Sequence, residues 1–166
     1  MKYATLACWC FALLARHAAA APVVEPMGFD LNITLSPKAT ARLQATREGI
    51  TVSASYYGDP TQQAEKHANR VGQIDLGREQ LRLPGRAGPV QVSGQGVKVD
   101  RLGWIRGGAK VNVNVFSSRL SHEDNVLSCD FIDADVALVV KAQPIELHCT
   151  LIEEGRDTKL QPRGER

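Results

Sequence analysis

The stretch Lys110-Val111-Asn112-Val113-Asn114-Val115-Phe116 decides the fold class, because its apolar residues alternate with polar ones at a period of two. Successive side chains of a β-strand point to opposite faces, so this alternation predicts a strand with one face on the core and the other toward solvent. Comparable strand-like stretches lie on both sides of it. They are residues 29–35, 49–57, 73–76, 80–83, 90–93, 97–100, 126–132, 136–141 and 145–152.

Strands at such short and regular spacing predict an all-β protein, namely an antiparallel β-sandwich of the immunoglobulin-like or a similar type. A barrel is the alternative, because the same strands could close on themselves. One or two short surface helices are expected. One covers residues 37–44 with Ser36 as its cap, and the other covers residues 60–69 with Asp59 as its cap.

The N-terminus has the pattern of a secretory signal. Lys2 is followed by a short apolar stretch over residues 3–15, and Arg16 and the alanines at 18–21 come next. A positive start, a short apolar segment and small residues are typical of a cleaved signal peptide. A transmembrane helix would need about 20 apolar residues, so no membrane span is expected after cleavage.

Three segments are therefore expected: residues 1–21 as signal peptide, residues 22–156 as one β-sandwich domain, and residues 157–166 as a flexible, charged C-terminal tail. The mature protein is expected in the periplasm or outside the cell. The alanine- and arginine-rich usage points to a bacterial source. The oligomeric state is left open.

The charge of the whole chain describes the precursor and not the mature domain. Of 166 residues, 20 are basic and 18 are acidic, which gives a net charge of +2. Because Lys2 and Arg16 belong to the expected signal, the mature chain carries 18 charges of each sign. A balanced charge gives no electrostatic footprint for nucleic acid, so no nucleic acid is expected as a partner.

The mature chain keeps two of the four cysteines, Cys129 and Cys149. In an oxidising compartment two cysteines most simply pair, so a disulfide is expected between them. The bridge would either staple neighbouring strands or link two sheets. The spacing of 20 residues does not match the C-x-x-C motif of redox sites.

The sequence contains no recognisable catalytic motif. It has no G-x-S-x-G elbow, no H-E-x-x-H and no phosphate-binding glycine motif. The mature chain has three histidines, His67, His122 and His148, and no local motif identifies a serine as a nucleophile that one of them could activate. We therefore predict no catalytic residue, no metal ligand and no cofactor, and the protein is expected not to be an enzyme.

Two short segments are candidates for binding a partner. Both mature tyrosines stand beside the turn that follows residues 49–57, and tyrosine is enriched among interface hot spots. A charged loop separates the strand at 110–116 from the next one. The candidate partner-binding residues of the two segments are Tyr56, Tyr57, Asp59, His122, Glu123 and Asp124.

These observations favour an exported, non-catalytic binding protein whose partner is another protein. An inhibitor or immunity protein against a secreted enzyme is one form, and an accessory subunit of an envelope assembly is another. The alternative is a carrier of a small molecule or lipid, which would require a cavity of about 300 Å³ or more inside a barrel. A hydrolase whose site is assembled from distant loops is the least favoured hypothesis.

Overall fold

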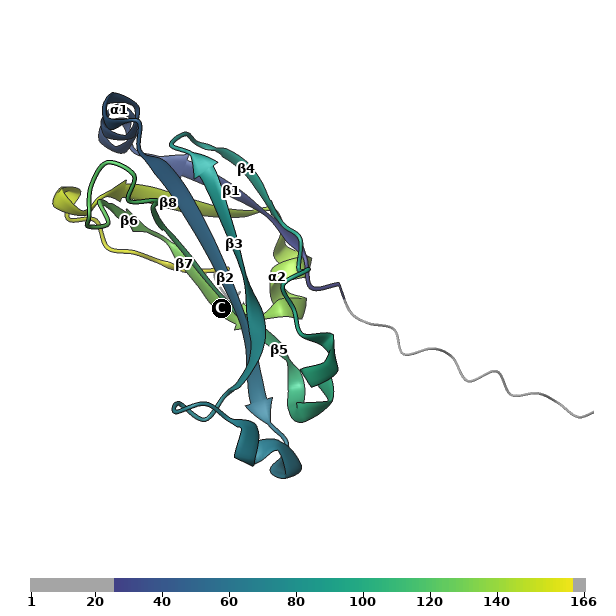
Figure 1. Ribbon diagram of the computed structural model, residues 1–166. Helices are drawn as coiled ribbons and strands as arrows, with labels where there is room; N and C mark the ends of the chain where they lie inside the picture. The colour runs from purple at the N-terminus through teal and green to yellow at the C-terminus, as the bar shows by residue number, and fades with distance from the viewer. Residues whose placement is uncertain (1–25, 163–166) are drawn as a thin grey trace, which may run out of the picture.

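The computed structural model describes residues 26–162 and places nearly half of them in two β-sheets (Figure 1). The strands are β1 (Phe29–Leu35), β2 (Gly49–Pro60), β3 (Ile74–Pro84), β4 (Gly88–Val92), β5 (Ile105–Ser117), β6 (Leu127–Cys129), β7 (Phe131–Asp135), β8 (Ile145–Leu151) and β9 (Leu160–Gln161). The helices are α1 (Pro37–Thr46), α2 (Val136–Ala142) and the short 3₁₀ helices η1 (Gln62–His67), η2 (Val99–Trp104) and η3 (Ile152–Glu154).

The two sheets pack face to face, which confirms the predicted β-sandwich. One sheet has the order β4-β1-β8-β6 and the other β3-β2-β5-β7-β9. Neither sheet closes on itself within residues 26–162, so the barrel alternative is not the fold of this region. The sheets are mixed, whereas the sequence predicted antiparallel pairing. β1 runs parallel to β8, and β7 runs parallel to β9, because both pairs join strands separated by intervening elements that can return the chain.

The core lies between the sheets and uses the inward face of each alternating strand. Leu31 and Ile33 of β1 are each 1% exposed, and Val111 and Val113 of β5 are fully buried. These side chains belong to one continuous cluster that includes residues of both sheets. Each fully buried aliphatic side chain contributes about 1.5–3 kcal/mol to folding, so the alternation read from the sequence supplies the main stabilisation.

The first predicted helix is confirmed and the second begins later than expected. α1 begins at Pro37, and the Ser36 hydroxyl accepts a hydrogen bond from the Ala39 amide at 3.0 Å, as expected of a helix cap. Asp59 does not cap a helix. Its carboxylate accepts a hydrogen bond from the Lys110 ammonium at 2.9 Å across the sheet, so Asp59 and the next residue stay in β2, and η1 follows them.

Residues 136–141 were predicted as a strand, and this was wrong, because they form α2. The stretch is almost wholly apolar, so its sequence shows no period that separates a strand from a buried helix. In the structure Val136 and Val139 are buried three positions apart, whereas Leu138 is 53% exposed. That spacing matches one helical face against the sandwich.

Two boundaries near β3 also differ from the prediction. The stretches 73–76 and 80–83 join into the single strand β3, with Gly77 in its middle at φ 109°. A Cβ at Gly77 would lie 2.1 Å from the carbonyl oxygen of Gly96, so only glycine fits where these backbones cross. Residues 97–100 form no strand. Val97 makes one isolated bridge to Gly77, and η2 begins at Val99.

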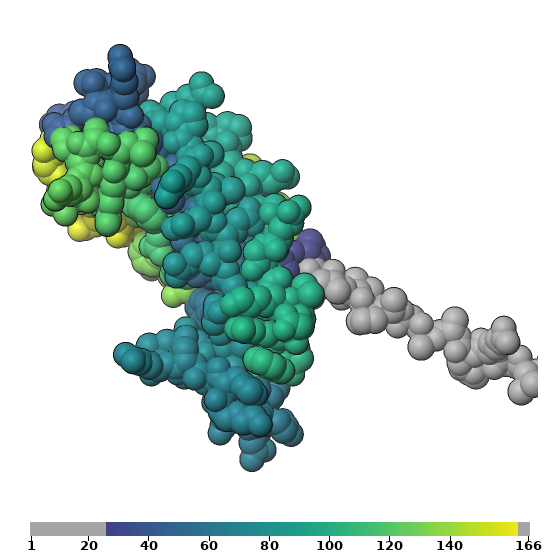
Figure 2. All heavy atoms as spheres, viewed as in Figure 1, coloured from purple at the N-terminus to yellow at the C-terminus, as the bar shows by residue number. Residues whose placement is uncertain are grey.

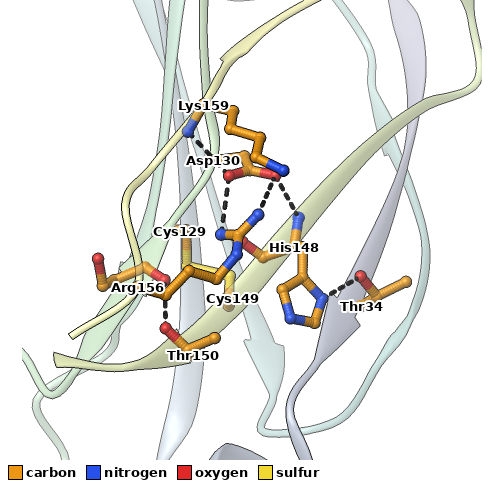
Figure 3. Close-up of polar contacts among 9 residues, drawn as sticks. Thr34, Cys129, Asp130, His148, Cys149, Thr150, Arg156 and Lys159 are labelled. Atoms are coloured by element: carbon orange, nitrogen blue, oxygen red, sulfur yellow. Dashed lines mark hydrogen bonds and ion pairs between the residues drawn. A yellow bond between two sulfur atoms is a disulfide. The ribbon is translucent and has the colours of Figure 1, made fainter. Parts of the chain in front are cut away.

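The predicted disulfide between Cys129 and Cys149 is present and joins the adjacent strands β6 and β8 of one sheet (Figure 3). Asp130, which is 3% exposed, comes directly after Cys129 in the chain. Its carboxylate binds the Arg156 guanidinium through two contacts of 2.9 and 3.1 Å and accepts the Lys159 amide at 2.9 Å. Burial has the largest single effect and raises the pKa of Asp130, but the contacts with Arg156 and the amides of Lys159 and His148 together outweigh it, so the pKa is lowered.

The segment expected to be a flexible tail thus begins with ordered structure. The contacts of Asp130 direct residues 156–159 onto the sheets, and Leu160–Gln161 then pairs with β7 as β9. The sequence could not reveal this arrangement, since the partners lie about 26 to 29 positions apart. The predicted signal peptide, residues 1–21, lies outside the described residues.

Candidate functional site

The predicted partner-binding residues lie at two opposite ends of the five-stranded sheet. β2 begins beside α1 and ends near η1 (Figure 1). From the first to the last of its 12 residues, at a rise of about 3.3 Å per step, β2 spans about 36 Å. Tyr56, Tyr57 and Asp59 lie in the half of β2 near η1. His122 lies at the end of the sheet beside α1, where its Nε2 is 3.5 Å from Nη2 of Arg42 in α1. The two segments therefore do not form one surface.

The two tyrosines have different surroundings. Tyr56 is 1% exposed and donates its hydroxyl to the Met27 carbonyl at 2.9 Å, so it belongs to the core. Burial and the charge of Glu79 raise its pKa. Tyr57 is half-buried on the outer sheet face and donates its hydroxyl to Asp133. Burial and this hydrogen bond raise the pKa of Tyr57 to about 12, so its hydroxyl stays protonated.

Tyr57 lines an open, polar hollow of about 370 Å³ on the outer face of the sheet. Figure 2 shows an indentation in the molecular outline between the projecting segment near residues 68–73 and the body of the sandwich. Asp75 and Arg78 on this side form an ion pair and a hydrogen bond, respectively, with other groups of the chain. Asp75 accepts the Lys98 ammonium at 2.6 Å, and the Arg78 guanidinium donates to the Ser55 hydroxyl at 2.9 Å. We call this surface the Tyr57 face.

The α1 end is built where three strand termini meet. Gly49, the first residue of β2, pairs with Pro84, the last residue of β3, and Ile50 pairs with Ser117, the last residue of β5. α1 precedes β2, and the loop of residues 118–126 follows β5. We use the name α1 end for α1 with residues 47–48 after it, this loop, η3, and residues 82–87, which end β3 and form the turn before β4.

Glu48 fixes the loop to the start of β2. Glu48 is buried, with only 2% of its surface exposed. The carboxylate accepts the amides of Gly49, Leu120 and Ser121 at 2.8–3.0 Å and the Ser121 hydroxyl at 2.7 Å. Burial raises the pKa of Glu48, but these hydrogen bonds outweigh it and lower the pKa from 4.5 to about 2. The carboxylate is therefore ionised at neutral pH and holds the loop in one geometry.

In this geometry the loop exposes an apolar side chain, and two residues at the α1 end have strained backbone conformations. Leu120 is 68% exposed although its amide is bound to Glu48. Arg47 and Arg119 adopt left-handed conformations with φ of 53° and 58°, and they are the two non-glycine residues with positive φ in the part of the chain that the structure describes. Each such residue costs about 1 kcal/mol or more, and conformations of this kind cluster at functional sites.

Beside Leu120 lies an open hollow of about 550 Å³. Its apolar wall includes Leu43 of α1 and Leu83 and Pro84 of β3. Three arginines from separate elements also line it, namely Arg47, Arg82 and Arg86. We call this depression the α1 hollow.

The arginines of the α1 end carry charge that is not matched by ion pairs. Across residues 26–162 the ion pairs involve Lys98, Arg101, Lys110 and Arg156. None of them lies at the α1 end, which carries five arginines. These are Arg42, Arg47, Arg82, Arg86 and Arg119.

Sequence reasoning found the loop through His122, Glu123 and Asp124 but missed Leu120 and the α1 hollow. The lining residues come from α1, β2, β3 and the three segments that follow α1, β3 and β5, so no local spacing links them. The Glu48 clamp joins positions 72 and 73 residues apart. The α1 hollow could have been predicted only from the strands that pair with one another. The sequence does not specify the order of the strands in the sheets, so this pairing was not known.

The three histidines among the described residues lie in three different environments. His67 stacks on Trp104 with ring centroids 4.4 Å apart, and the Nδ1 atom of His148 lies 2.8 Å from the Thr34 hydroxyl (Figure 3). His122 contacts Arg42. Within the described residues, no group of three or more His, Cys, Asp and Glu side chains is placed to hold a metal ion. No helix among residues 26–162 is long and apolar enough to cross a membrane.

Comparison of the chain with protein-family models, with curated proteins and with solved structures found no match. The function is therefore argued from the chemistry of the two surfaces.

Proposed function

We propose that the chain is an exported, non-catalytic binding protein whose partner is another protein, and that the α1 end is its binding surface. The observation that carries the proposal is the buried Glu48 carboxylate, which clamps a loop whose Leu120 side chain is exposed. An inhibitor or immunity protein against a secreted enzyme is one form of this function. An accessory subunit of an envelope assembly is another.

The clamp supports a binding role because it orders the loop before any partner arrives. A flexible loop loses conformational entropy when it binds, and a loop held in advance avoids much of this cost. Three donors of the loop, namely the amides of Leu120 and Ser121 and the Ser121 hydroxyl, bind Glu48 and fix residues 120 and 121. The clamp thus supports rigid presentation of Leu120 rather than a mobile surface loop.

The side chains presented there suit a protein partner. Leu120 is 68% exposed and Ile152 of η3, at the same end, is 55% exposed. Arginine is enriched at protein interfaces and among their hot spots, and the α1 end carries five. Apolar residues surrounded by arginines favour recognition of a protein surface.

Export is supported by two features. The sequence begins with the pattern of a cleaved signal peptide, and Cys129 and Cys149 form a disulfide. Disulfides persist in oxidising compartments such as the periplasm or the cell exterior.

The two alternatives receive less support from the same observations. A carrier would need an enclosed cavity, whereas buried side chains of both sheets form one packed cluster and the α1 hollow is open at the surface. A hydrolase with a histidine base would need a histidine beside a nucleophile in a cleft, and the three mature histidines lie apart.

Affinity capture from the exported-protein fraction of the source cells tests the proposal. The baits are the wild type, Leu120→Asp at the α1 end, and Val71→Asp as a matched control on a residue 75% exposed near the opposite end. We expect a partner that the wild type and Val71→Asp retain equally and Leu120→Asp loses. Equal capture by all three baits, or capture of no protein by any of them, would contradict the proposal. Thermal unfolding of each bait confirms that it is folded.

A further inference from the structure

We infer that the α1 hollow receives an acidic segment of the protein partner, with one apolar side chain of that segment seated on its apolar wall. This inference rests on the proposed function and specifies the chemistry of the partner. The arginines of the rim would bind carboxylates on either side of the seated side chain.

The shape of the hollow fits one inserted side chain and its neighbours. At about 550 Å³ it lies within the range of 300–1,000 Å³ that binding pockets commonly have. Leu43 is 1% exposed and belongs to the core, so this part of the wall is fixed. Leu83 is half-buried and packs against the core from β3. An apolar side chain placed here would remove the exposed carbons of Leu83 and Pro84 from water.

The charge of the rim selects an anionic segment. Arg47, Arg82 and Arg86 line the hollow, and none of the ion pairs within residues 26–162 involves them. The carboxylate of Glu48 is also in the wall, but its oxygens are occupied by four donors of the chain and the residue is 2% exposed. Arginine binds carboxylates through two parallel hydrogen bonds, which gives both strength and orientation.

The surroundings favour a protein segment over a membrane surface or a nucleic acid. Glu123, Asp124 and Glu153 are exposed at the same end and would repel a continuous layer of phosphates. A protein segment can place its carboxylates on the arginines and keep them away from these acids. A shaped depression with an apolar wall also suits a single side chain better than a flat array of headgroups.

A displayed library of random 12-residue peptides provides the probe. Selection on the wild type is followed by counter-selection on the double variant Arg82→Glu/Arg86→Glu. We expect the enriched peptides to carry several Asp or Glu residues around one large apolar residue. Enrichment of peptides without this pattern, or no enrichment, would overturn the inference.

Titration of an enriched peptide then tests the two parts of the site separately. Arg82→Glu/Arg86→Glu should weaken binding at least about tenfold, and added salt should weaken binding to the wild type. The control is Lys66→Glu/Arg70→Glu, which makes the same change in net charge on exposed residues near η1 and should bind like the wild type. Replacing the apolar residue of the peptide by serine should also weaken binding. Equal affinity for both double variants would overturn the inference.

Two further measurements exclude other occupants. Binding to anionic phosphatidylglycerol vesicles that depends on Arg82 and Arg86 would assign the hollow to a membrane and overturn the inference. Self-association in analytical ultracentrifugation that Arg82→Glu/Arg86→Glu abolishes would assign it to a second copy, with the same consequence. We expect neither.

Affinity capture separates failure of this inference from failure of the proposed function. A partner lost by Leu120→Asp but retained by Arg82→Glu/Arg86→Glu would overturn the acidic segment and leave the proposed function standing. Capture that is indifferent to Leu120→Asp would overturn the proposed function itself. We expect both variants to lose the partner.

Discussion

The α1 end and the Tyr57 face carry similar residue types but use them in opposite ways. On the Tyr57 face the polar groups bind one another, as Tyr57 does with Asp133 and Asp59 with Lys110. At the α1 end the one buried carboxylate, Glu48, binds backbone amides, whereas Arg82 and Arg86 form no ion pair within the described residues. The α1 end thus combines exposed apolar side chains with five arginines that form no ion pair within the described residues.

This difference matters for binding. A partner at the Tyr57 face would have to replace contacts that the chain already makes, and each replaced hydrogen bond returns little net free energy. A partner at the α1 end meets exposed apolar and cationic groups that are already held in position.

The largest expected effect follows from removing the clamp. Glu48→Ala leaves the amides of Leu120 and Ser121 without their charged acceptor, and we expect a loss of about 3–5 kcal/mol in the free energy of unfolding. Denaturant titration measures it. Glu123→Ala, an exposed residue of the same loop, is the control and should change the stability by less than about 0.5 kcal/mol. Similar small losses in both variants would remove the clamp from the account.

The second prediction concerns pH. The pKa of Glu48 is about 2 in the folded protein and 4.5 in the unfolded chain. A lowered pKa stabilises the fold above pH 4.5, and this contribution, about 3 kcal/mol, is lost as the pH falls from 4.5 toward 2. Asp130 contributes in the same direction because Arg156 lowers its pKa.

Glu48→Gln isolates the part that belongs to the clamp. We expect this variant to be less stable than the wild type at pH 6 and to lose less stability as the pH falls, since its amide does not titrate. Denaturant titrations at pH 6 and pH 3 give the comparison. An acid dependence as steep as that of the wild type would show that Glu48 does not hold the loop through its charge.

The smallest effect is expected on the Tyr57 face. Tyr57→Phe removes the hydrogen bond to Asp133 on a half-exposed surface, so we expect a loss of about 0.5–1.5 kcal/mol in stability and no change in capture of the partner. Denaturant titration and affinity capture with this variant check both statements. Loss of the partner without loss of stability would move the binding surface from the α1 end to the Tyr57 face.

The fold could be predicted further than the site, for reasons visible in particular residues. The alternation at 110–116 reports the side-chain period of a strand directly, so β5 was expected there. Residues 136–141 defeated the same reasoning because a uniformly apolar run has no period. The cap at Ser36 was predicted because its partner, Ala39, is only three positions away.

The α1 hollow lay beyond sequence reasoning because its residues meet only after strand order is known. Arg47 and Arg82 are 35 positions apart and become neighbours through the pairing of β2 with β3. His122 lies in the same loop as Leu120, but the sequence around Leu120 does not show that its side chain is exposed. The order of the strands determines which residues meet at the site. The alternation along a single strand carries no information about that order.

Hydrogen exchange of the chain with and without its captured partner tests the central claim most directly. The account predicts new protection in residues 118–122 and 82–86 and unchanged exchange in residues 55–59 and 73–78. Protection confined to the Tyr57 face, with the α1 end exchanging as in the free chain, would contradict it.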